Sequence, residues 1–200
     1  MRVLVAGASG AVGIRLIRIL VAAGHRVTGL TRSPSKAEPL RRAGATPVVV
    51  DALDPPALRE AVLGAQPEVV VHEMTALANA SDLRCFDSAF AQTNRLRTEG
   101  LDHLLGAARE VGARKLVAQS YCGWPFARVG GPVKTEDDPL DSRPPREFQR
   151  SLKPYVTSKV LSPKRRSLKA LSCVMAHFMA QARDCSMGRR STNCGGGSFP

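Results

Sequence analysis

Three glycines near the start of the chain constrain its fold more than any other feature. The apolar residues 3–6 are typical of a strand buried on both faces, and residues 7–13 follow with glycines at the spacing G-x-x-G-x-x-G. Apolar residues then recur at helical spacing over residues 14–23, and Gly24 stands where a helix C-terminal cap is expected. The sequence therefore predicts a strand, a glycine turn and a helix as one continuous unit.

The glycine turn has the properties of an anion-binding site. Exposed N–H groups and the positive end of the helix dipole point at whatever lies over such a turn. Gly7 allows a tight turn, Gly10 lets the backbone approach a phosphate, and Gly13 lets the helix pack close to the strand. The flanking strand and helix favour a dinucleotide pyrophosphate over a purely structural connection. We therefore expect cofactor contacts from Gly7, Ala8, Ser9, Gly10, Ala11, Val12 and Gly13.

The loop after the second predicted strand indicates which dinucleotide binds. Residues 26–30 are predicted to form that strand and residues 31–36 the loop, where such a fold contacts the adenosine ribose. An acidic residue there selects NAD, but this loop contains no acid and holds Arg32 and Lys36. Both side chains suit the 2′-phosphate of NADP. NADP is therefore the expected cofactor, with NAD binding or a simple solvated basic loop as alternatives.

Strands and helices continue to alternate along the chain. The pattern predicts helices at residues 36–43, 55–63 and 94–108, helix and loop over residues 80–92, and strands at residues 46–50, 69–72 and 115–118. Asp51 and Ala52 follow the third strand, at the ligand-facing end of an open sheet, where Asp51 can accept a hydrogen bond from an adenine amine. Asp54 is either a second such group or the N-cap of the next helix. The alternation predicts an α/β fold, a doubly wound parallel sheet with helices on both faces.

Composition bounds the class of protein. A chain of 200 residues, 44% of them hydrophobic, suits one α/β domain. It has no signal peptide and no apolar run of about 18 residues, so we expect a cytoplasmic protein that does not associate with membranes. Reduced thiols and no metal are expected, because no C-x-x-C pair and no histidine at zinc spacing accompanies the cysteines, which are Cys85, Cys122, Cys173, Cys185 and Cys194.

The net charge of +12 is concentrated at the end of the chain. Residues 151–200 hold 9 Lys and Arg against 1 acidic residue, whereas residues 1–150 hold 20 against 16. No nucleic-acid motif and no interleaved aromatic residues accompany the basic excess, so we expect no nucleic-acid partner.

These features together resemble the extended and atypical short-chain dehydrogenase/reductases, the NAD-dependent epimerase/dehydratase group. The resemblance covers about residues 1–145 and includes residues 7–13, 51–54, 69–76 and 135–140, with Asn94 and Ser120. It implies a Rossmann-like fold, Asn94 among the cofactor contacts, and hydride transfer to or from a carbon bearing oxygen. The implied substrate is a small carbonyl, hydroxyl or nucleotide-sugar compound, and the full-length protein is expected as a homodimer. A non-catalytic NADP-binding sensor and an inactive truncated product are the alternatives.

The resemblance also implies catalytic groups. Such proteins use a Ser or Thr that hydrogen-bonds the substrate oxygen, and a Tyr-x-x-x-Lys pair as acid/base. Ser120 matches the serine position, although Gln119 stands where a second serine is common, and a backbone contact is the other interpretation of Ser120. Tyr155 and Lys159 match the pair by spacing. We do not assign them the role, because they lie 35 residues beyond Ser120 and prolines interrupt the helix that would present them.

Residues 151–200 differ in composition from the rest of the chain. They contain eight Ser, three of the five Cys and almost no acid, without a sustained helical or strand period. Either a disordered basic tail or a reading-frame slip near residues 148–153 explains this. If the codons from Ala170 onward are read out of frame, taking the third base of each with the first two of the next, permitted synonymous codons allow Leu-Val-Leu-Arg-Tyr-Gly-Ser-Phe-Tyr-Gly. This sequence resembles the family's motif on the substrate side of the cleft. Under this interpretation the fold is incomplete at the C-terminus and lacks its sixth strand and substrate lobe, so we expect marginal stability and aggregation.

Overall fold

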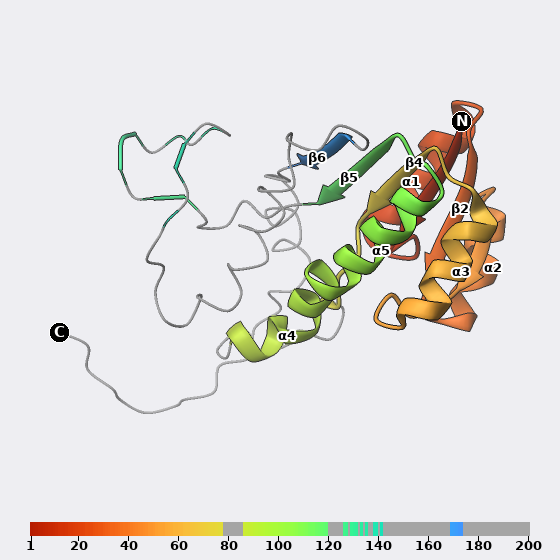
Figure 1. The fold of residues 1–200 in the computed structure, drawn as a ribbon, viewed down its shortest axis with the longest axis horizontal. Helices are drawn as coiled ribbons and strands as arrows, with labels where there is room; N and C mark the ends of the chain where they lie inside the picture. Colours follow the sequence, from red (N-terminus) through yellow and green to blue (C-terminus); the bar gives the residue numbers. More distant parts are fainter. Residues whose placement is uncertain are drawn as a thin grey trace, which may run out of the picture.

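Strand and helix alternate through most of the chain (Figure 1). The computed structural model describes residues 1–77, 86–119, 126–127, 129–131, 133, 135, 138–139, 141 and 169–173. The strands are β1 (Arg2–Ala6), β2 (Arg26–Thr31), β3 (Thr46–Val49), β4 (Val69–His72), β5 (Lys115–Gln119) and β6 (Lys169–Cys173). The helices are α1 (Ala11–Ala22), α2 (Ala37–Arg42), α3 (Pro55–Ala65), α4 (Phe86–Arg97), α5 (Glu99–Glu110) and the short 3-10 helix η1 (Pro34–Lys36).

The strands form one parallel sheet in the order β3-β2-β1-β4-β5-β6. The chain first moves outward from β1 to β3, then crosses to the other side of β1 and continues to β6. This arrangement is the doubly wound, Rossmann-like fold, and it confirms the predicted fold class. Ligands of such sheets bind beyond the carboxyl ends of the strands, where the strand order reverses, which here is between β1 and β4.

The prediction that the chain lacks a sixth strand is wrong. Residues 169–173 pair in parallel with β5, from Lys169 opposite Lys115 to Cys173 opposite Gln119. A proline-free segment can add to an open strand edge through its backbone alone, so five residues without a long apolar period were missed. The other residues of 151–200 lie outside the described part of the chain. Their interpretation as a disordered or out-of-frame tail stays a prediction.

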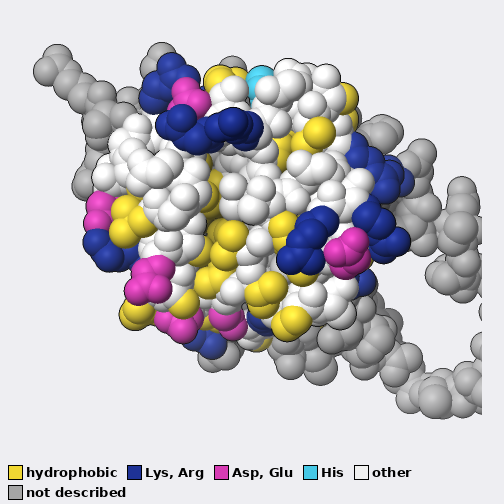
Figure 2. Space-filling model, turned by 90° about the vertical axis from the view of Figure 1, so that its right-hand side faces the viewer, with side chains coloured by type: hydrophobic (Ala, Val, Ile, Leu, Met, Phe, Trp, Pro, Cys, Tyr) yellow, Lys and Arg dark blue, Asp and Glu magenta, His cyan; other side chains and the backbone are white. Residues whose placement is uncertain are grey.

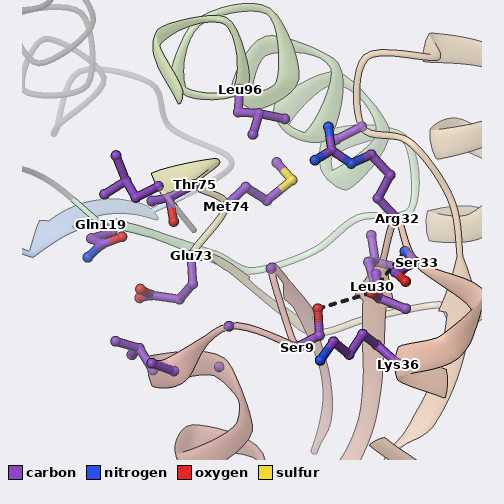
Figure 3. A pocket seen from close by; sticks show the side chains of 18 of the residues that line it. Ser9, Leu30, Arg32, Ser33, Lys36, Glu73, Met74, Thr75, Leu96 and Gln119 are labelled. Carbon is purple, nitrogen blue, oxygen red and sulfur yellow. Dashed lines mark hydrogen bonds between the residues drawn. The ribbon is translucent and has the colours of Figure 1, made fainter. Parts of the chain in front are cut away.

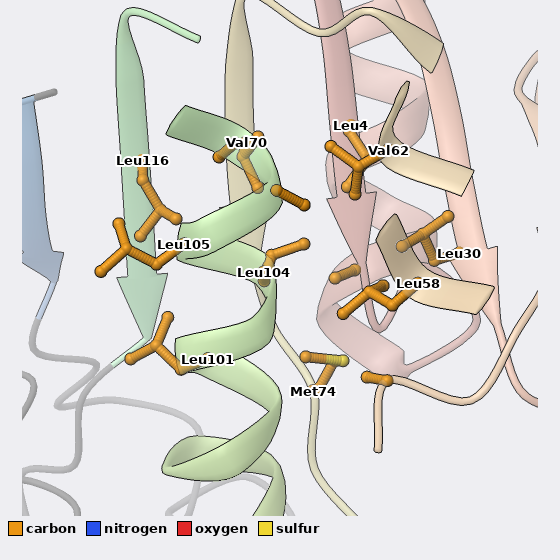
Figure 4. Close-up of a cluster of buried hydrophobic side chains, with 14 of the residues drawn as sticks. Leu4, Leu30, Leu58, Val62, Val70, Met74, Leu101, Leu104, Leu105 and Leu116 are labelled. Atoms are coloured by element: carbon orange, nitrogen blue, oxygen red, sulfur yellow. The ribbon is translucent and has the colours of Figure 1, made fainter. Parts of the chain in front are cut away.

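Alternate residues of the central strands supply a hydrophobic core on each face of the sheet. Leu4, Val70 and Leu116 pack on one face against α3 and α5, where they meet Leu58 and Leu104 (Figure 4). Each of these five side chains is at most 1% exposed, so this layer is dry and closely packed.

The opposite face is covered by α1 and α2. Val3 and Val5 of β1 contact a cluster that includes Ile17 of α1 and Leu40 of α2. Because Leu4 lies in the other core, β1 is buried on both faces, as its continuous apolar sequence predicts. The N-terminal strand is thereby fixed in the middle of the molecule, and so is the turn that follows it.

The helix predicted over residues 94–108 is longer and bent. Helical structure begins at Phe86, within the helix and loop expected over residues 80–92, and it is interrupted at Thr98, where φ is −102° and ψ is −80°. The Thr98 hydroxyl donates to the carbonyl of Asn94 at 2.9 Å, a local bond that is typical of bends in helices. The backbone bonds continue across the bend, since Asp102 N–H donates to Thr98 O at 2.9 Å.

The surface on the side of α2 and α3 is mixed in character. Figure 2 shows Lys and Arg side chains there in separate groups, with acidic and hydrophobic side chains between them. Among the helices of the described residues, none has the length and apolar character needed to cross a bilayer.

Candidate functional site

The glycine turn between β1 and α1 is closed by contacts between backbone atoms. Gly7 has φ of +86°, and a Cβ placed on it would lie 2.5 Å from the carbonyl oxygen of Glu73. A Cβ on Gly13 would lie 2.4 Å from the carbonyl oxygen of Gly7. The structural roles predicted for these two glycines, a tight turn and close packing of the helix, are confirmed. A Cβ on Gly10 would meet only Gly7 O, at 3.3 Å, so its role toward a phosphate stays a prediction.

Two neighbouring residues hold this turn against β2. Ala8 is fully buried beneath the turn, and its N–H donates to Leu30 O at 3.1 Å. The hydroxyl of Ser9 shares a hydrogen bond of 3.0 Å with that of Thr31, whose oxygen also accepts from Ser33 N–H at 3.3 Å. The turn is therefore linked to the loop after β2 before any ligand binds.

A cavity of about 710 Å³ opens over the turn at the carboxyl ends of the strands (Figure 3). It brings together most of the residues predicted to contact a cofactor: Gly7, Ser9, Gly10, Ala11, Val12, Gly13, Arg32, Lys36, Asp51 and Ala52. Two predicted residues do not line it. Ala8 lies below the turn, and Asn94 lies on α4, where its neighbours Leu96 and Arg97 line the cavity instead.

One end of the cavity is basic. Arg32 and Lys36 line it from the loop and the 3-10 helix that follow β2, and Figure 3 shows both side chains beside Ser33. The Ser33 hydroxyl shares a hydrogen bond of 2.9 Å with that of Ser35. Two cations and several hydroxyl groups form a set of donors that suits an anionic group at this end.

The two aspartates after β3 have different positions. Asp51 lines the cavity, and its Oδ1 accepts a hydrogen bond from Leu53 N–H at 2.9 Å. Asp54 is the N-cap of α3, since its Oδ1 accepts from Ala57 N–H at 3.2 Å, so the capping alternative is confirmed for this residue. His103 of α5 contacts the carbonyl oxygen of Ala52 through Nδ1 at 3.1 Å, and this contact links the loop after β3 to α5.

The opposite end of the cavity contains groups that the sequence analysis missed. Glu73 and Thr75 follow β4, Gln119 ends β5, and Arg97 ends α4. Burial raises the pKa of the Glu73 carboxyl, and the positive charge of Arg97 acts in the opposite direction. The signal was the position of Glu73 directly after a buried strand. This position could be related to the glycine turn only once the structure showed that β4 pairs with β1.

The predicted catalytic residues are not placed by this structure. Ser120 lies outside the described residues, so its catalytic role stays a prediction. Tyr155 and Lys159, which match the Tyr-x-x-x-Lys spacing but are not assigned that role, also lie outside them. In the part of the chain that is described, no group of three or more His, Cys, Asp and Glu side chains is arranged to hold a metal ion.

A parallel sheet in this order, with a glycine turn under a cleft at its switch point, is typical of proteins that bind a dinucleotide. Residues 7–156 match the model of the NAD(P)H-binding family, and the chain belongs to this family of oxidoreductase- and epimerase-like proteins. The family resemblance found in the sequence is thereby confirmed. The choice between NAD and NADP is not made by this match.

Two curated relatives are reductases by name. The chain is 52% identical over 140 residues to a 3-diazoavenalumate denitrifying reductase of a Streptomyces species, an alignment that covers 70% of this chain and 44% of the relative. It is 32% identical over 149 residues to a 4-hydroxy-2-methyl-3-oxo-4-farnesyl-3,4-dihydroquinoline-1-oxide ketoreductase of Stigmatella aurantiaca, covering 72% and 40%. The chain thus spans less than half the length of these relatives.

Solved structures of epimerases share the fold. The UDP-glucose 4-epimerase of Thermus thermophilus, in complex with NAD, is 25% identical with a TM-score of 0.68, and the superposition covers 86% of this chain and 54% of the epimerase.

Proposed function

We propose that this chain carries the NADPH-binding part of a reductase that transfers hydride to a small organic substrate. The observation that carries the proposal is the cavity over the glycine turn, lined by residues that the sequence predicts as cofactor contacts. The names of the two curated relatives support reduction over epimerisation.

The residues around the turn fit a pyrophosphate. Gly10 begins α1 without a side-chain cap, and the first turn of α1 contains no acid that would compete with a phosphate. Over the crowded backbone of Gly7 and Gly13, the N–H groups of the first turn of α1 would hold the two phosphates. Asp51 would accept a hydrogen bond from the adenine amine, and Arg32 with Lys36 would hold the 2′-phosphate of NADP.

The substrate class we propose is an arenediazonium ion, following the name of the relative at 52% identity. NADPH held by Arg32, Lys36 and the glycine turn would supply a hydride, and reduction would exchange the C–N bond at the ring carbon for a C–H bond. Dinitrogen leaves with the electron pair of that bond, and the products are the arene and NADP⁺. A carbonyl compound is the competing acceptor, and the assay below separates the two.

A titration tests the cofactor assignment. We expect NADPH to bind at least about tenfold more tightly than NADH, because only NADPH carries the 2′-phosphate that Arg32 would contact. Arg32→Ala should remove most of this difference. Arg18→Ala is the matched control, since Arg18 is an exposed arginine of α1 that does not line the cavity. Equal affinities of the wild-type chain for NADPH and NADH would discard the Arg32 assignment.

Turnover is tested on the protein made when one base is added back near codon 150, which shifts translation into the proposed normal frame. NADPH oxidation is measured with a diazotised aromatic acid and with a panel of carbonyl compounds. Release of dinitrogen with the first substrate supports the proposed reaction, and turnover of carbonyl compounds alone contradicts the substrate class. Binding of NADPH without any turnover would instead support an NADP-binding sensor.

A further inference from the structure

Glu73 introduces a negative charge into a cavity that is proposed to bind phosphates. It directly follows β4, its N–H donates to Ala6 O at 2.8 Å, and its carbonyl oxygen packs against Gly7. Figure 3 shows its carboxylate on the same side of the turn as Thr75 and Gln119, away from Arg32 and Lys36. The backbone contacts fix the position of this residue relative to the glycine turn.

The carboxylate is half-buried, and one of its oxygens is covered by protein. Oε2 has no hydrogen-bond partner among the described residues. A buried acceptor without a partner destabilises a folded chain, and groups of this kind concentrate at ligand sites, where a bound molecule completes them. The backbone hydrogen bond to Ala6 holds Glu73 in place independently of its carboxylate, which also feels the positive charge of Arg97.

The strand order assigns the two ends of the cavity to different halves of a dinucleotide. Arg32 and Asp51 follow β2 and β3, on the side proposed for the adenosine half. Glu73 follows β4 and Gln119 ends β5, across the switch point, where the second half of a dinucleotide lies in doubly wound folds. We propose that the Glu73 carboxylate faces the nicotinamide half of the cofactor and favours its oxidised, positively charged ring over the reduced, uncharged ring. The inference rests on the proposed function.

The physical basis is the change of charge at the nicotinamide. A carboxylate attracts the positively charged pyridinium ring of the oxidised cofactor. The dihydropyridine ring of the reduced cofactor has no net charge, so this attraction is absent there, and the difference is large in a partly desolvated cleft. Arg97, buried at the end of α4, opposes the effect with its own positive charge, whereas Thr75 and Gln119 are neutral. A residual preference for the oxidised form makes the loss of hydride from the bound, reduced cofactor more favourable. Glu73 is thus a positioning and tuning residue for reduction.

Three probes separate the two halves of the cofactor and its two oxidation states. Isothermal titration measures the affinities of the full chain and of Glu73→Gln for 2′,5′-ADP, NADPH and NADP⁺. The affinity for 2′,5′-ADP, which lacks the nicotinamide, should change by less than about twofold. The preference for NADP⁺ over NADPH should fall by about fivefold or more in Glu73→Gln, because a neutral amide replaces the charge.

Two further variants make the result specific. Glu73→Asp keeps the charge and should keep most of the wild-type preference. Glu60→Gln removes an exposed carboxylate of α3 that does not line the cavity, and should match the wild type. Thermal unfolding without ligand verifies that each variant is folded, and Glu73→Ala replaces Glu73→Gln if the amide variant does not fold.

The outcomes distinguish this inference from the proposed function. If the wild-type chain binds neither NADPH nor 2′,5′-ADP, the proposed function and the inference both fail. If the wild type binds all three probes and Glu73→Gln keeps the same ratio of NADP⁺ to NADPH affinity, only the role of Glu73 is overturned. Equal weakening of 2′,5′-ADP and NADPH in a folded Glu73→Gln variant would also overturn it, because the carboxylate would then act on the adenosine half.

Discussion

A single methyl group at Gly13 would collide with the backbone of the turn. A Cβ there would lie 2.4 Å from Gly7 O and 2.7 Å from Ala8 O, and backbone atoms cannot rotate aside as a flexible side chain can. Gly13→Ala must therefore push α1 away from β1. We expect the free energy of unfolding to fall by about 2 kcal/mol and NADPH affinity to fall by at least about tenfold. Denaturant unfolding and titration with NADPH measure the two effects.

Gly64→Ala is the matched control for this substitution. Gly64 lies in α3 with no atom within 4 Å of the position of a Cβ, so alanine should raise stability by up to about 1 kcal/mol through helix propensity. If Gly13→Ala proves as harmless as Gly64→Ala, the turn is looser than its geometry indicates, and the cradle proposed for the pyrophosphate loses its basis.

Single residues of the cleft were predictable where local chemistry decides their role. The glycine spacing and the basic pair Arg32 and Lys36 are readable because turn geometry and charge act within a few residues of sequence. Ala8 was assigned to the cofactor but is buried, because spacing does not show which residue of a turn points inward. Glu73 and Gln119 were missed because their proximity depends on β1, β4 and β5 being neighbours, which is a property of the whole sheet.

At the scale of elements, a buried histidine joins β4 to α4. His72 is 1% exposed, and its Nε2 lies 3.0 Å from Leu96 O. Burial lowers the pKa of His72 from 6.5 to about 4. The folded state therefore disfavours protonation, whereas the unfolded chain binds a proton near its ordinary pKa. The contribution of neutral His72 to stability is complete above pH 6.5 and is lost progressively as the pH falls from 6.5 to about 4.

The size of this loss is at most about 3.5 kcal/mol, since each pKa unit corresponds to about 1.4 kcal/mol. Denaturant unfolding at pH 7.5 and pH 4.5 measures it. His72→Gln, which keeps an amide donor near Leu96 O, should be less stable at pH 7.5 but should lose less stability on acidification. His25→Gln should retain the pH dependence of the wild type, because His25 lies outside this contact, between α1 and β2. A wild-type chain equally stable at both pH values would contradict the assignment.

Elements with a long apolar period were predicted well, and elements formed by context were not. The core strands β1 and β4 are continuous apolar runs, so their sequence specifies them. The bend at Thr98 depends on one hydroxyl group, and β6 depends on the free edge of β5, so neither is visible in hydrophobic periodicity. The break at Thr98 divides the helix expected over residues 94–108 between the end of α4 and most of α5.

At the scale of the whole molecule, the chain changes character after about residue 150. The family match ends at residue 156, and the basic, serine-rich composition begins at residue 151. We predict that the nucleotides of the gene, read in the frame displaced by one base from Ala170, encode Leu-Val-Leu-Arg-Tyr-Gly. The first of these codons overlap β6 of the given frame. Sequencing the gene and its transcript decides the question, and any other displaced reading would refute the frame slip.

Every group proposed for the adenosine half of the cofactor comes from the first 52 residues, far upstream of the change in composition. Ribosomal errors or mutations after codon 150 therefore leave this half of the cleft intact while altering whatever lies beyond it. If the proposed frame slip and the proposed NADP binding both hold, a cell that accumulates such a product would hold part of its NADP pool on a protein that does not recycle it. The harm caused by the defective product would then scale with its abundance and not with any lost activity.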